Sequence, residues 1–282
     1  MIIRGDARRL PLADESVDAI ITDPPYEMNF QRRAWDRSGV AYDVETWREA
    51  HRVLKPGARM LVFGGPRTHH RIWCAIEDAG FVLEDTIGWL YASGWPKHRW
   101  KLKPAYEPIA VARKEPVTAL NIDAARIPPD ARWPANVALD EDAAALLDAE
   151  FPGVSRFYYC AKASYAERNA GLERFPLRNV QKLNPSGIAA RRAAAGQGLG
   201  RNHHPTVKPV DLIRWLVRLV TRPGDLVLDQ FAGSGTTGVA CTLEGRRFIL
   251  VENDSEYCEI AEHRVAAAPL PLPLFTAAGA GD

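Results

Sequence analysis

Short apolar runs alternate with amphipathic stretches along the first 115 residues of the chain. Residues 46–55 and 67–80 repeat apolar positions at helical spacing, and in the first stretch Trp47, Ala50 and Leu54 fall on one face. The apolar runs have the length of buried strands and lie at residues 17–22, 58–65, 81–90 and 106–114. This order predicts an α/β fold with a doubly wound, mostly parallel sheet and helices on both of its faces.

The pattern of strands and helices returns near the C-terminus. Residues 210–222 carry apolar side chains on one helical face, and the strand-like runs 225–229 and 246–252 flank a glycine-rich turn. Between the two halves, residues 116–202 lose the regular periodicity and contain prolines and alanine runs. We therefore expect one domain formed by residues 1–115 and 203–266, an inserted region at 116–202, and a disordered tail at 267–282.

The composition is that of a globular protein, with 46% hydrophobic and 25% charged residues. The formal net charge is only +1, so any binding of nucleic acid has to rest on local basic patches. The four cysteines show neither CxxC spacing nor a disulfide framework, which fits a reducing cytoplasm and predicts no metal site. The sequence has no apolar leader and no run of about 18 apolar residues, so we expect a soluble, cytoplasmic protein that does not enter a membrane.

The glycine-rich turn has the surroundings of a nucleoside or nucleotide site. Gly233, Gly235 and Gly238 form GxGxxG directly after a strand, and Glu252 ends the next strand nineteen residues beyond Gly233. Such glycines let the backbone approach a ligand, and a carboxylate on the neighbouring strand accepts hydrogen bonds from ribose hydroxyls. Asp229, just before the turn, would repel a pyrophosphate but could accept hydrogen bonds from an ammonium group. S-adenosylmethionine therefore fits better than NAD; a turn that binds no ligand is the alternative.

Three motifs together resemble the beta class of exocyclic-amino DNA methyltransferases. They are DPPY at residues 23–26, NHHPTVKP at 202–209 and DQFAGSGTTG at 229–238. In that class the catalytic motif comes first, a target-recognition region lies in the middle, and the cofactor motif comes last. The resemblance implies a Rossmann-like methyltransferase fold in circularly permuted order, in which residues 1–5 supply the strand beside 246–252. It also makes residues 116–202 the target-recognition region.

The resemblance further implies which residues hold S-adenosylmethionine. Asp229 and Phe231 would line its methionine end together with the glycines, and Glu252 would hold the ribose. In the family, HPTVKP grips the methionyl group, and Lys208 could also offset the cofactor carboxylate. The implied cofactor-binding residues are Asp6 near the adenine, Thr206, Lys208, Asp229, Phe231, Gly233, Gly235, Thr236 and Glu252. Gln230 stands where relatives more often have proline, and it faces no evident chemistry.

The chemistry of DPPY follows from its residues. The exocyclic amine of a base is a poor nucleophile, because its lone pair is delocalised into the ring. Pro24 and Pro25 supply no N–H and favour an extended backbone, so the Asp23 carboxylate and the Pro24 carbonyl can accept both hydrogens of an NH2 group. The ring of Tyr26 can stack on a flipped base. We therefore predict Asp23, Pro24, Pro25 and Tyr26 as the catalytic residues; a rigid turn that only ends the strand is the alternative.

Two basic stretches are candidates for contact with DNA. Residues 93–104 interleave tryptophans with basic residues, and residues 174–201 contain six basic residues and no acidic one. The candidate DNA-binding residues are Lys97, Arg99, Lys101, Arg174, Arg178, Lys182, Arg191 and Arg192. Either stretch could instead be a solvated surface loop.

These features predict a site-specific enzyme that moves a methyl group from S-adenosylmethionine to an exocyclic amine of a flipped base in double-stranded DNA. Adenine N6 is favoured over cytosine N4, because family members with Asp before the two prolines are mostly adenine enzymes. An RNA or protein-amide methyltransferase and a nucleotide-dependent oxidoreductase or binder are the alternatives. We expect a nucleoid-associated enzyme of a prokaryotic or phage-infected cell. The recognition sequence, homodimer formation and a companion restriction nuclease are left open.

Overall fold

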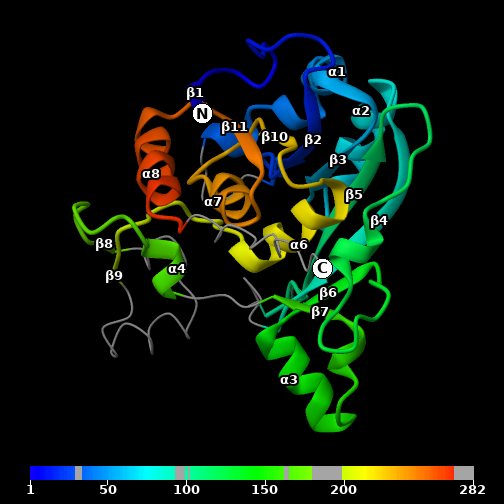
Figure 1. Ribbon diagram of the computed structural model, residues 1–282. Helices are drawn as coiled ribbons and strands as arrows, with labels where there is room; N and C mark the ends of the chain where they lie inside the picture. Colours follow the sequence, from blue (N-terminus) through cyan, green and yellow to red (C-terminus); the bar gives the residue numbers. More distant parts are fainter. Residues whose placement is uncertain (29–33, 93–98, 101, 162–164, 180–198, 270–282) are drawn as a thin grey trace, which may run out of the picture.

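The computed structural model describes residues 1–28, 34–92, 99–100, 102–161, 165–179 and 199–269 (Figure 1). Its strands are β1 (Ile2–Arg4), β2 (Val17–Thr22), β3 (Leu54–Phe63), β4 (Val82–Leu90), β5 (Tyr106–Arg113), β6 (Val137–Asp140), β7 (Tyr159–Ala161), β8 (Arg178–Asn179), β9 (Leu199–Gly200), β10 (Leu226–Asp229) and β11 (Arg247–Glu252). Its α-helices are α1 (Val44–Val53), α2 (His69–Asp78), α3 (Glu141–Glu150), α4 (Tyr165–Asn169), α6 (Val210–Val220), α7 (Thr236–Leu243) and α8 (Ser255–Ala266). Short 3-10 turns lie at Ala34–Arg37, Val40–Tyr42, Ile122–Ala125 and Ser155–Phe157.

Within the described residues, the central sheet has nine strands in the order β1-β11-β10-β2-β3-β5-β4-β6-β7. Neighbouring strands pair in parallel except at β5, which runs antiparallel to both β3 and β4. At one edge β1 pairs in parallel with β11, with Ile3 opposite Val251. This pairing confirms that the N-terminal residues supply the strand beside β11, as the permuted order requires. The mostly parallel, Rossmann-like sheet is likewise as predicted.

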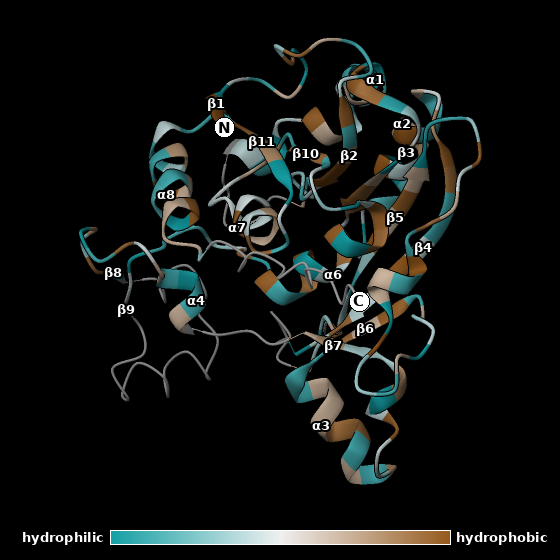
Figure 2. Cartoon of the chain, viewed as in Figure 1, coloured by the Kyte–Doolittle hydropathy of each residue, from teal (hydrophilic) through white to brown (hydrophobic). Residues whose placement is uncertain are grey.

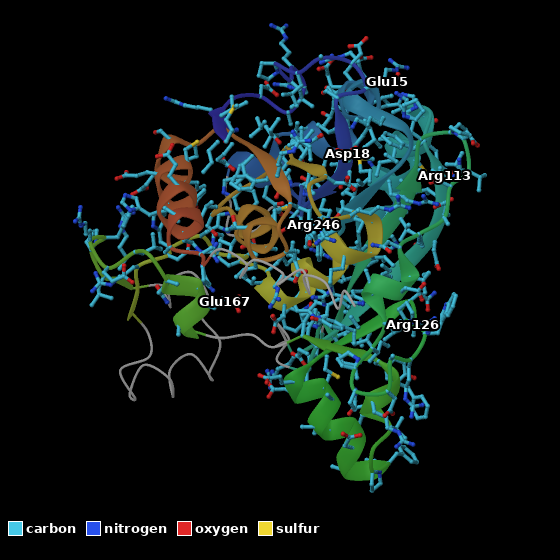
Figure 3. All side chains as sticks on the ribbon, in the orientation of Figure 1. Glu15, Asp18, Arg113, Arg126, Glu167 and Arg246 are labelled. Atoms are coloured by element: carbon cyan, nitrogen blue, oxygen red, sulfur yellow. The ribbon has the colours of Figure 1, made fainter. Side chains whose placement is uncertain are left out.

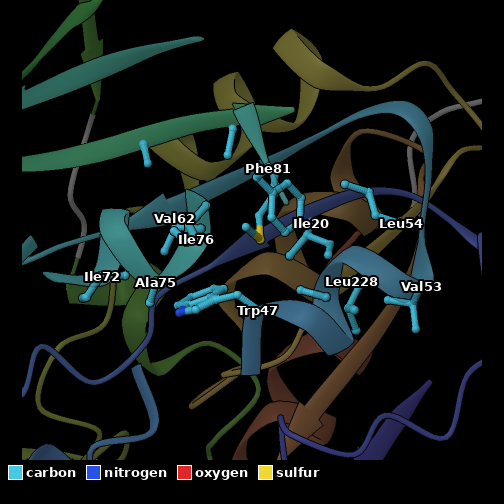
Figure 4. Packing of buried hydrophobic residues seen from close by; sticks show 14 of the residues in the cluster. Ile20, Trp47, Val53, Leu54, Val62, Ile72, Ala75, Ile76, Phe81 and Leu228 are labelled. Carbon is cyan, nitrogen blue, oxygen red and sulfur yellow. The ribbon is translucent and has the colours of Figure 1, made fainter. Parts of the chain in front are cut away.

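Both faces of the sheet are buried at its central strands. In β2 the apolar residues occupy neighbouring positions, which is typical of a strand covered on both sides. Ile20 packs in a cluster with Trp47 of α1 and Ile76 of α2, as Figure 4 shows. Ile21 instead packs in the cluster that contains α6 and α7. Figure 1 accordingly shows α1 and α2 on one side of the sheet and α6, α7 and α8 on the other, and Figure 2 shows apolar residues along the central strands.

Residues 116–161 continue the central sheet. β6 pairs in parallel with β4, and β7 pairs in parallel with β6. Asp140 ends β6 and caps α3, because its Oδ1 accepts a hydrogen bond from Ala143 N at 2.7 Å. None of the residues of α3 is buried, and the helix points away from the rest of the molecule in Figure 1.

Parts of two predicted regions lie outside the described residues. They are residues 162–164 and 180–198 of the predicted target-recognition region and residues 270–282 of the predicted tail. The role of the first region and the disorder of the second therefore stay predictions.

Asp18 joins three strands at their amino-terminal ends (Figure 3). On β2, its Oδ1 pairs with Nζ of Lys55 at 2.6 Å, and its Oδ2 accepts a hydrogen bond from Leu226 N at 2.8 Å. These contacts connect β2 to β3 and β10. The carboxyl ends of the same strands lie at the other end of the sheet, and parallel sheets bind their ligands at the carboxyl ends of their strands.

Candidate active site

A hollow of about 2110 Å³ opens at the carboxyl ends of β2, β10 and β11. It is lined by both DPPY and the glycine-rich turn, which lie more than 200 residues apart in the sequence. The structure therefore brings together most of the predicted catalytic and cofactor-binding residues. Those that line the hollow are Asp6, Asp23, Pro24, Pro25, Tyr26, Thr206, Lys208, Asp229, Phe231, Gly233, Thr236 and Glu252.

Asp229 ends β10 as a buried carboxylate that is held by three donors. Its Oδ1 accepts hydrogen bonds from Thr22 Oγ1 at 2.7 Å and Phe231 N at 3.1 Å, and its Oδ2 accepts one from Thr237 Oγ1 at 2.6 Å. Burial raises the pKa of Asp229 to about 6, although these three donors oppose the shift. A carboxylate can accept about four hydrogen bonds. One acceptor position, on Oδ2, is therefore left for a donor in the hollow.

The first glycine of the turn is required by its close contacts. Gly233 has a φ of +49°, and a Cβ there would lie 2.6 Å from Nε2 of His204. His204 is half-buried, and the removal of its ring from water lowers its pKa to about 3, so the ring is neutral. Gly233 N donates to Oε2 of Glu252 at 2.7 Å, while Oε1 of Glu252 accepts from Asn253 N and Asp254 N, both at 2.9 Å. Glu252 therefore fixes the turn against β11 as well as lining the hollow.

Gly235 lies behind the hollow rather than on its wall. It precedes α7 with a φ of +78°, and a Cβ there would lie 2.7 Å from Cβ of Ala261 on α8. The structure thus gives Gly235 a packing role, and its predicted contact with the cofactor stays a prediction.

The Gly235→Ala substitution is expected to lower the free energy of unfolding by about 2–4 kcal/mol, because backbone strain and overpacking add. Gly39→Ala is the matched control: Gly39 has a φ of +74°, but a Cβ there would meet nothing within 4 Å, so only the backbone strain applies. Denaturant unfolding of both variants separates the two contributions. Equal losses of stability would show that α8 does not press on Gly235.

Asp23 belongs to a partly buried cluster of two carboxylates and one ammonium group. Its Oδ2 accepts a hydrogen bond from Nζ of Lys208 at 2.6 Å, and the same Nζ lies 3.3 Å from Oε2 of Glu107. The hydroxyl of Tyr26 donates to Oε2 of Glu107 at 2.8 Å. Oδ1 of Asp23 is buried and has no hydrogen-bond partner within the described part of the chain. The cluster therefore offers an open acceptor beside a net negative charge.

The protonation of this cluster follows from burial and from the charges within it. Burial raises the pKa of Asp23, Lys208 opposes that shift, and Glu107 adds to it. Burial lowers the pKa of Lys208, but the two carboxylates outweigh it, so the pKa of Lys208 is raised overall. Lys208 therefore stays charged at neutral pH and favours the ionised form of Asp23.

Two predicted cofactor residues have protein partners that the sequence did not indicate. The sequence placed the ammonium group of Lys208 beside the cofactor carboxylate, whereas the structure pairs it with Asp23 and Glu107. Asp6 lines the hollow and pairs with Nη2 of Arg8 at 2.7 Å, and this hydrogen bond lowers the pKa of Asp6. Both side chains are thus held in place by neighbouring charges.

Sequence reasoning missed two residues that bind Asp229 and one that binds the neighbours of Asp23. Thr22 and Thr237 bind Asp229, and Glu107 binds Lys208 and Tyr26. The available signals were weak: Thr22 directly precedes DPPY, Thr237 is the second threonine of the TT pair, and Glu107 is a lone acid at the start of a strand.

Three of the predicted DNA-binding residues fall within the described residues. Arg99 and Arg174 are exposed, and Arg178 pairs with Glu256, which offsets part of its charge. The other predicted DNA-binding residues lie outside the described part of the chain and are Lys97, Lys101, Lys182, Arg191 and Arg192. In the ranges that the structure describes, no group of three or more His, Cys, Asp or Glu side chains could hold a metal ion, and no helix there has the length and apolarity of a membrane span.

Comparison with known proteins finds relatives along most of the chain. Residues 17–263 match the family described as DNA methylase. The chain is 26% identical over 261 residues to the type II methyltransferase M.HpaI of Haemophilus parainfluenzae, and the match covers 90% of this chain and 69% of that protein.

Solved structures share the fold. The complex of M1.HpyAVI with SAM superposes with a TM-score of 0.58 at 24% identity, over 94% of this chain and 98% of that one. The PvuII DNA methyltransferase, described as cytosine-N4-specific, gives a TM-score of 0.62 at 20% identity, over 93% of this chain and 85% of that one. Because the family match spans both motifs and most of the sequence, the chain belongs to the DNA methylase family of N6-adenine and N4-cytosine amino-methyltransferases, enzymes that use S-adenosylmethionine.

Proposed function

We propose that this chain is a site-specific DNA methyltransferase that transfers the methyl group of S-adenosylmethionine to an exocyclic amine of a base turned out of the duplex. The observation that carries the proposal is the meeting of DPPY and the glycine-rich turn at one hollow. Oδ1 of Asp23 is buried at that hollow without a hydrogen-bond partner among the described residues. Adenine N6 is favoured over cytosine N4, because Asp precedes the two prolines.

The residues around the glycine-rich turn fit the cofactor. Asp229 keeps an acceptor position for an ammonium group, and Glu252 ends the neighbouring strand, where a ribose is held in nucleoside-binding sheets. The hollow, at about 2110 Å³, is larger than the roughly 300–1,000 Å³ of a site for one small ligand. It therefore has room for the cofactor and a base together.

The residues of DPPY act on the attacking amine. S-adenosylmethionine supplies an electrophilic methyl group on a positively charged sulfur. Oδ1 of Asp23 and the Pro24 carbonyl accept the two amine hydrogens, which localises the lone pair on nitrogen and stabilises the positive charge that develops there. With the cofactor bound, the lone pair would form the N–C bond as the C–S bond breaks, the sulfur would leave as a neutral thioether, and the nitrogen would then release a proton to solvent. Glu107 holds the hydroxyl of Tyr26, whose ring stacks on the base.

The affinity for S-adenosylmethionine is expected to fall as the pH is lowered through about 6. Asp229, with a pKa of about 6, must be ionised to offset the ligand ammonium, so affinity should drop by up to about tenfold per pH unit below that value. The stability of the free protein should depend on pH in the opposite direction. Because the pKa of Asp229 is raised in the folded state, its protonated form stabilises the fold at low pH, and this contribution is lost as the pH rises through 6. Calorimetric titrations between pH 5 and 8 measure the binding effect.

Asp229→Asn is the control for this pH dependence. The variant keeps the shape of the side chain but has no titrating group, so it should bind S-adenosylmethionine more weakly and with little change between pH 5 and 7. A wild-type affinity that stays constant over the same range would contradict the role given to Asp229.

Double-stranded DNA is the partner that this function requires, and the cytoplasm of a prokaryotic or phage-infected cell is where we propose it acts. The exposed Arg99 and Arg174 are candidates for contact with the phosphate backbone. Dimer formation and a companion restriction nuclease stay open.

An acceptor competition experiment tests the proposed class of substrate. The protein is incubated with labelled S-adenosylmethionine and a mixture of duplex DNA, RNA and protein extract. Label is expected in DNA alone, and unlabelled duplex DNA should remove it by competition. Label in RNA or protein would support the second class of function, an RNA or protein-amide methyltransferase. Calorimetric binding of NAD in place of S-adenosylmethionine would support a nucleotide-dependent oxidoreductase or binder.

A further inference from the structure

Arg264 is a buried cation beneath the glycine-rich turn. It lies on α8 with 2% of its surface exposed. Its Nη1 donates to the carbonyl oxygen of Ser234 at 2.7 Å, to Oγ of Ser234 at 3.1 Å and to Oγ1 of Thr236 at 3.1 Å. Its Nε and Nη2 are buried and have no hydrogen-bond partner in the described part of the chain. Burial lowers the pKa of Arg264 to about 10, and the nearby Glu167, labelled in Figure 3, opposes that shift, so the group is charged at neutral pH.

Hydrogen-bond chemistry fixes the direction of the two hydroxyls that Arg264 contacts. A guanidinium group only donates, so Oγ of Ser234 and Oγ1 of Thr236 must act as acceptors toward Arg264. Each hydroxyl hydrogen is then left to donate to another group. Ser234 and Thr236 both line the hollow. The turn therefore has two hydroxyls at the wall of the hollow that can act as donors, with a buried positive charge behind them.

The next residue, Thr237, makes a hydrogen bond in the opposite direction. Thr237 donates to Asp229, whereas its neighbour Thr236 accepts from Arg264. The two adjacent threonines thus connect to a buried acid and a buried base. An α-amino acid carries an ammonium and a carboxylate on one carbon, which matches this separation of charge. Lys208, the cation that the sequence offered for the carboxylate, is already paired with Asp23 at 2.6 Å.

We propose that Arg264 is a positioning residue for the carboxylate of the methionine end of S-adenosylmethionine, acting through the hydroxyls of Ser234 and Thr236. The proposal rests on the proposed function and adds the residue that selects the carboxylate. Arg264 does not touch the ligand. It orients the two hydroxyls as donors and supplies the charge that makes them strong ones.

Calorimetry with two ligands tests this role. S-adenosylmethionine is compared with its decarboxylated form, which keeps the adenosine, the sulfonium and the ammonium group but lacks the carboxylate. The variants are Arg264→Met and the control Arg246→Met. Arg246, labelled in Figure 3, is also a buried arginine, 8% exposed, but it binds Thr221 and the Glu244 carbonyl. Both variants lose a buried cation, so a merely structural effect should appear in both.

In Arg264→Met, the Kd for S-adenosylmethionine should rise about tenfold or more, while the Kd for the decarboxylated form should change less than about twofold. Arg246→Met should leave the ratio of the two affinities unchanged. If Arg264→Met does not fold, the double variant Ser234→Ala with Thr236→Val should show the same selective loss. Equal losses for both ligands, or no loss, would overturn the role of Arg264 alone. A wild-type protein that binds neither ligand would contradict the proposed function itself.

Discussion

Asp23→Asn is expected to lower the rate of methyl transfer by about 10²–10³-fold while leaving S-adenosylmethionine bound. Oδ1 of Asp23 is a buried carboxylate acceptor at the hollow and has no hydrogen-bond partner among the described residues. Asparagine keeps the size and one acceptor but removes the negative charge that faces the amine as it becomes positive. Single-turnover rates with labelled cofactor measure the first effect, and calorimetry measures the second.

Asp18→Asn provides a matched control at the other end of β2, the strand that Asp23 directly follows. The side chains of Asp18 and Asp23 are 20% and 21% exposed, and each pairs with one lysine at 2.6 Å. Asp18 lies at the amino-terminal end of β2, away from the hollow, so its loss should reduce stability but not the rate of the folded enzyme. An Asp23→Asn variant that keeps more than about a tenth of the wild-type rate would contradict the electrostatic role of Asp23.

Lys208→Met is expected to move the acid limb of the pH–rate profile to higher pH and to lower the rate at pH 7 by about tenfold or more. Transfer needs the ionised form of Asp23, whose pKa burial already raises and Lys208 holds down. Without the ammonium group, the carboxylates of Asp23 and Glu107 face each other with no positive charge between them, which raises the pKa of Asp23 further. Removing a positive neighbour raises the pKa of Asp23, so the lost activity should return as the pH is raised.

A second substitution checks the sign of this effect. Glu107 raises the pKa of Asp23, so adding Glu107→Gln to Lys208→Met should move the profile part of the way back. Lys208→Arg, which keeps the charge, should shift the profile less than Lys208→Met does. Single-turnover rates measured between pH 6 and 9 test whether Lys208 and Glu107 shift the pKa of Asp23. A profile that Lys208→Met leaves in place, or that the double variant moves further upward, would rule out the proposed coupling.

The order of the helices and strands, and the permuted order of the sheet, could largely be predicted from the sequence. The run at residues 17–22 is apolar at neighbouring positions because β2 is covered on both faces, and the spacing of Trp47, Ala50 and Leu54 marks the buried side of α1 and the residue that follows it. The order of the motifs predicted the permuted sheet, and β1 beside β11 confirms it. The antiparallel direction of β5 was not predicted, because a pattern of burial carries no information on strand direction.

The site was predictable where one short motif carries the chemistry and unpredictable where distant residues meet. Asp23 and Asp229 stand out in the sequence because each ends a strand inside a recognisable motif. The partner of Asp23 is Lys208, 185 residues away, and nothing local to either residue indicates the pairing. Arg264 looks like a solvated charge at the end of a helix, and only the packing of α8 against the turn buries it. Long-range contacts of this kind depend on tertiary packing, which hydrophobic periodicity does not encode.

Nucleoside analysis of methylated DNA tests the central claim most directly. Duplex DNA is incubated with the wild-type protein and S-adenosylmethionine, digested to nucleosides and analysed by mass spectrometry beside a reaction with Asp23→Asn. We expect N6-methyladenine, or N4-methylcytosine if cytosine is the target, with the wild type and very little with the variant. The absence of both methylated nucleosides, from a protein shown to bind S-adenosylmethionine and presented with DNA of varied sequence, would contradict the account.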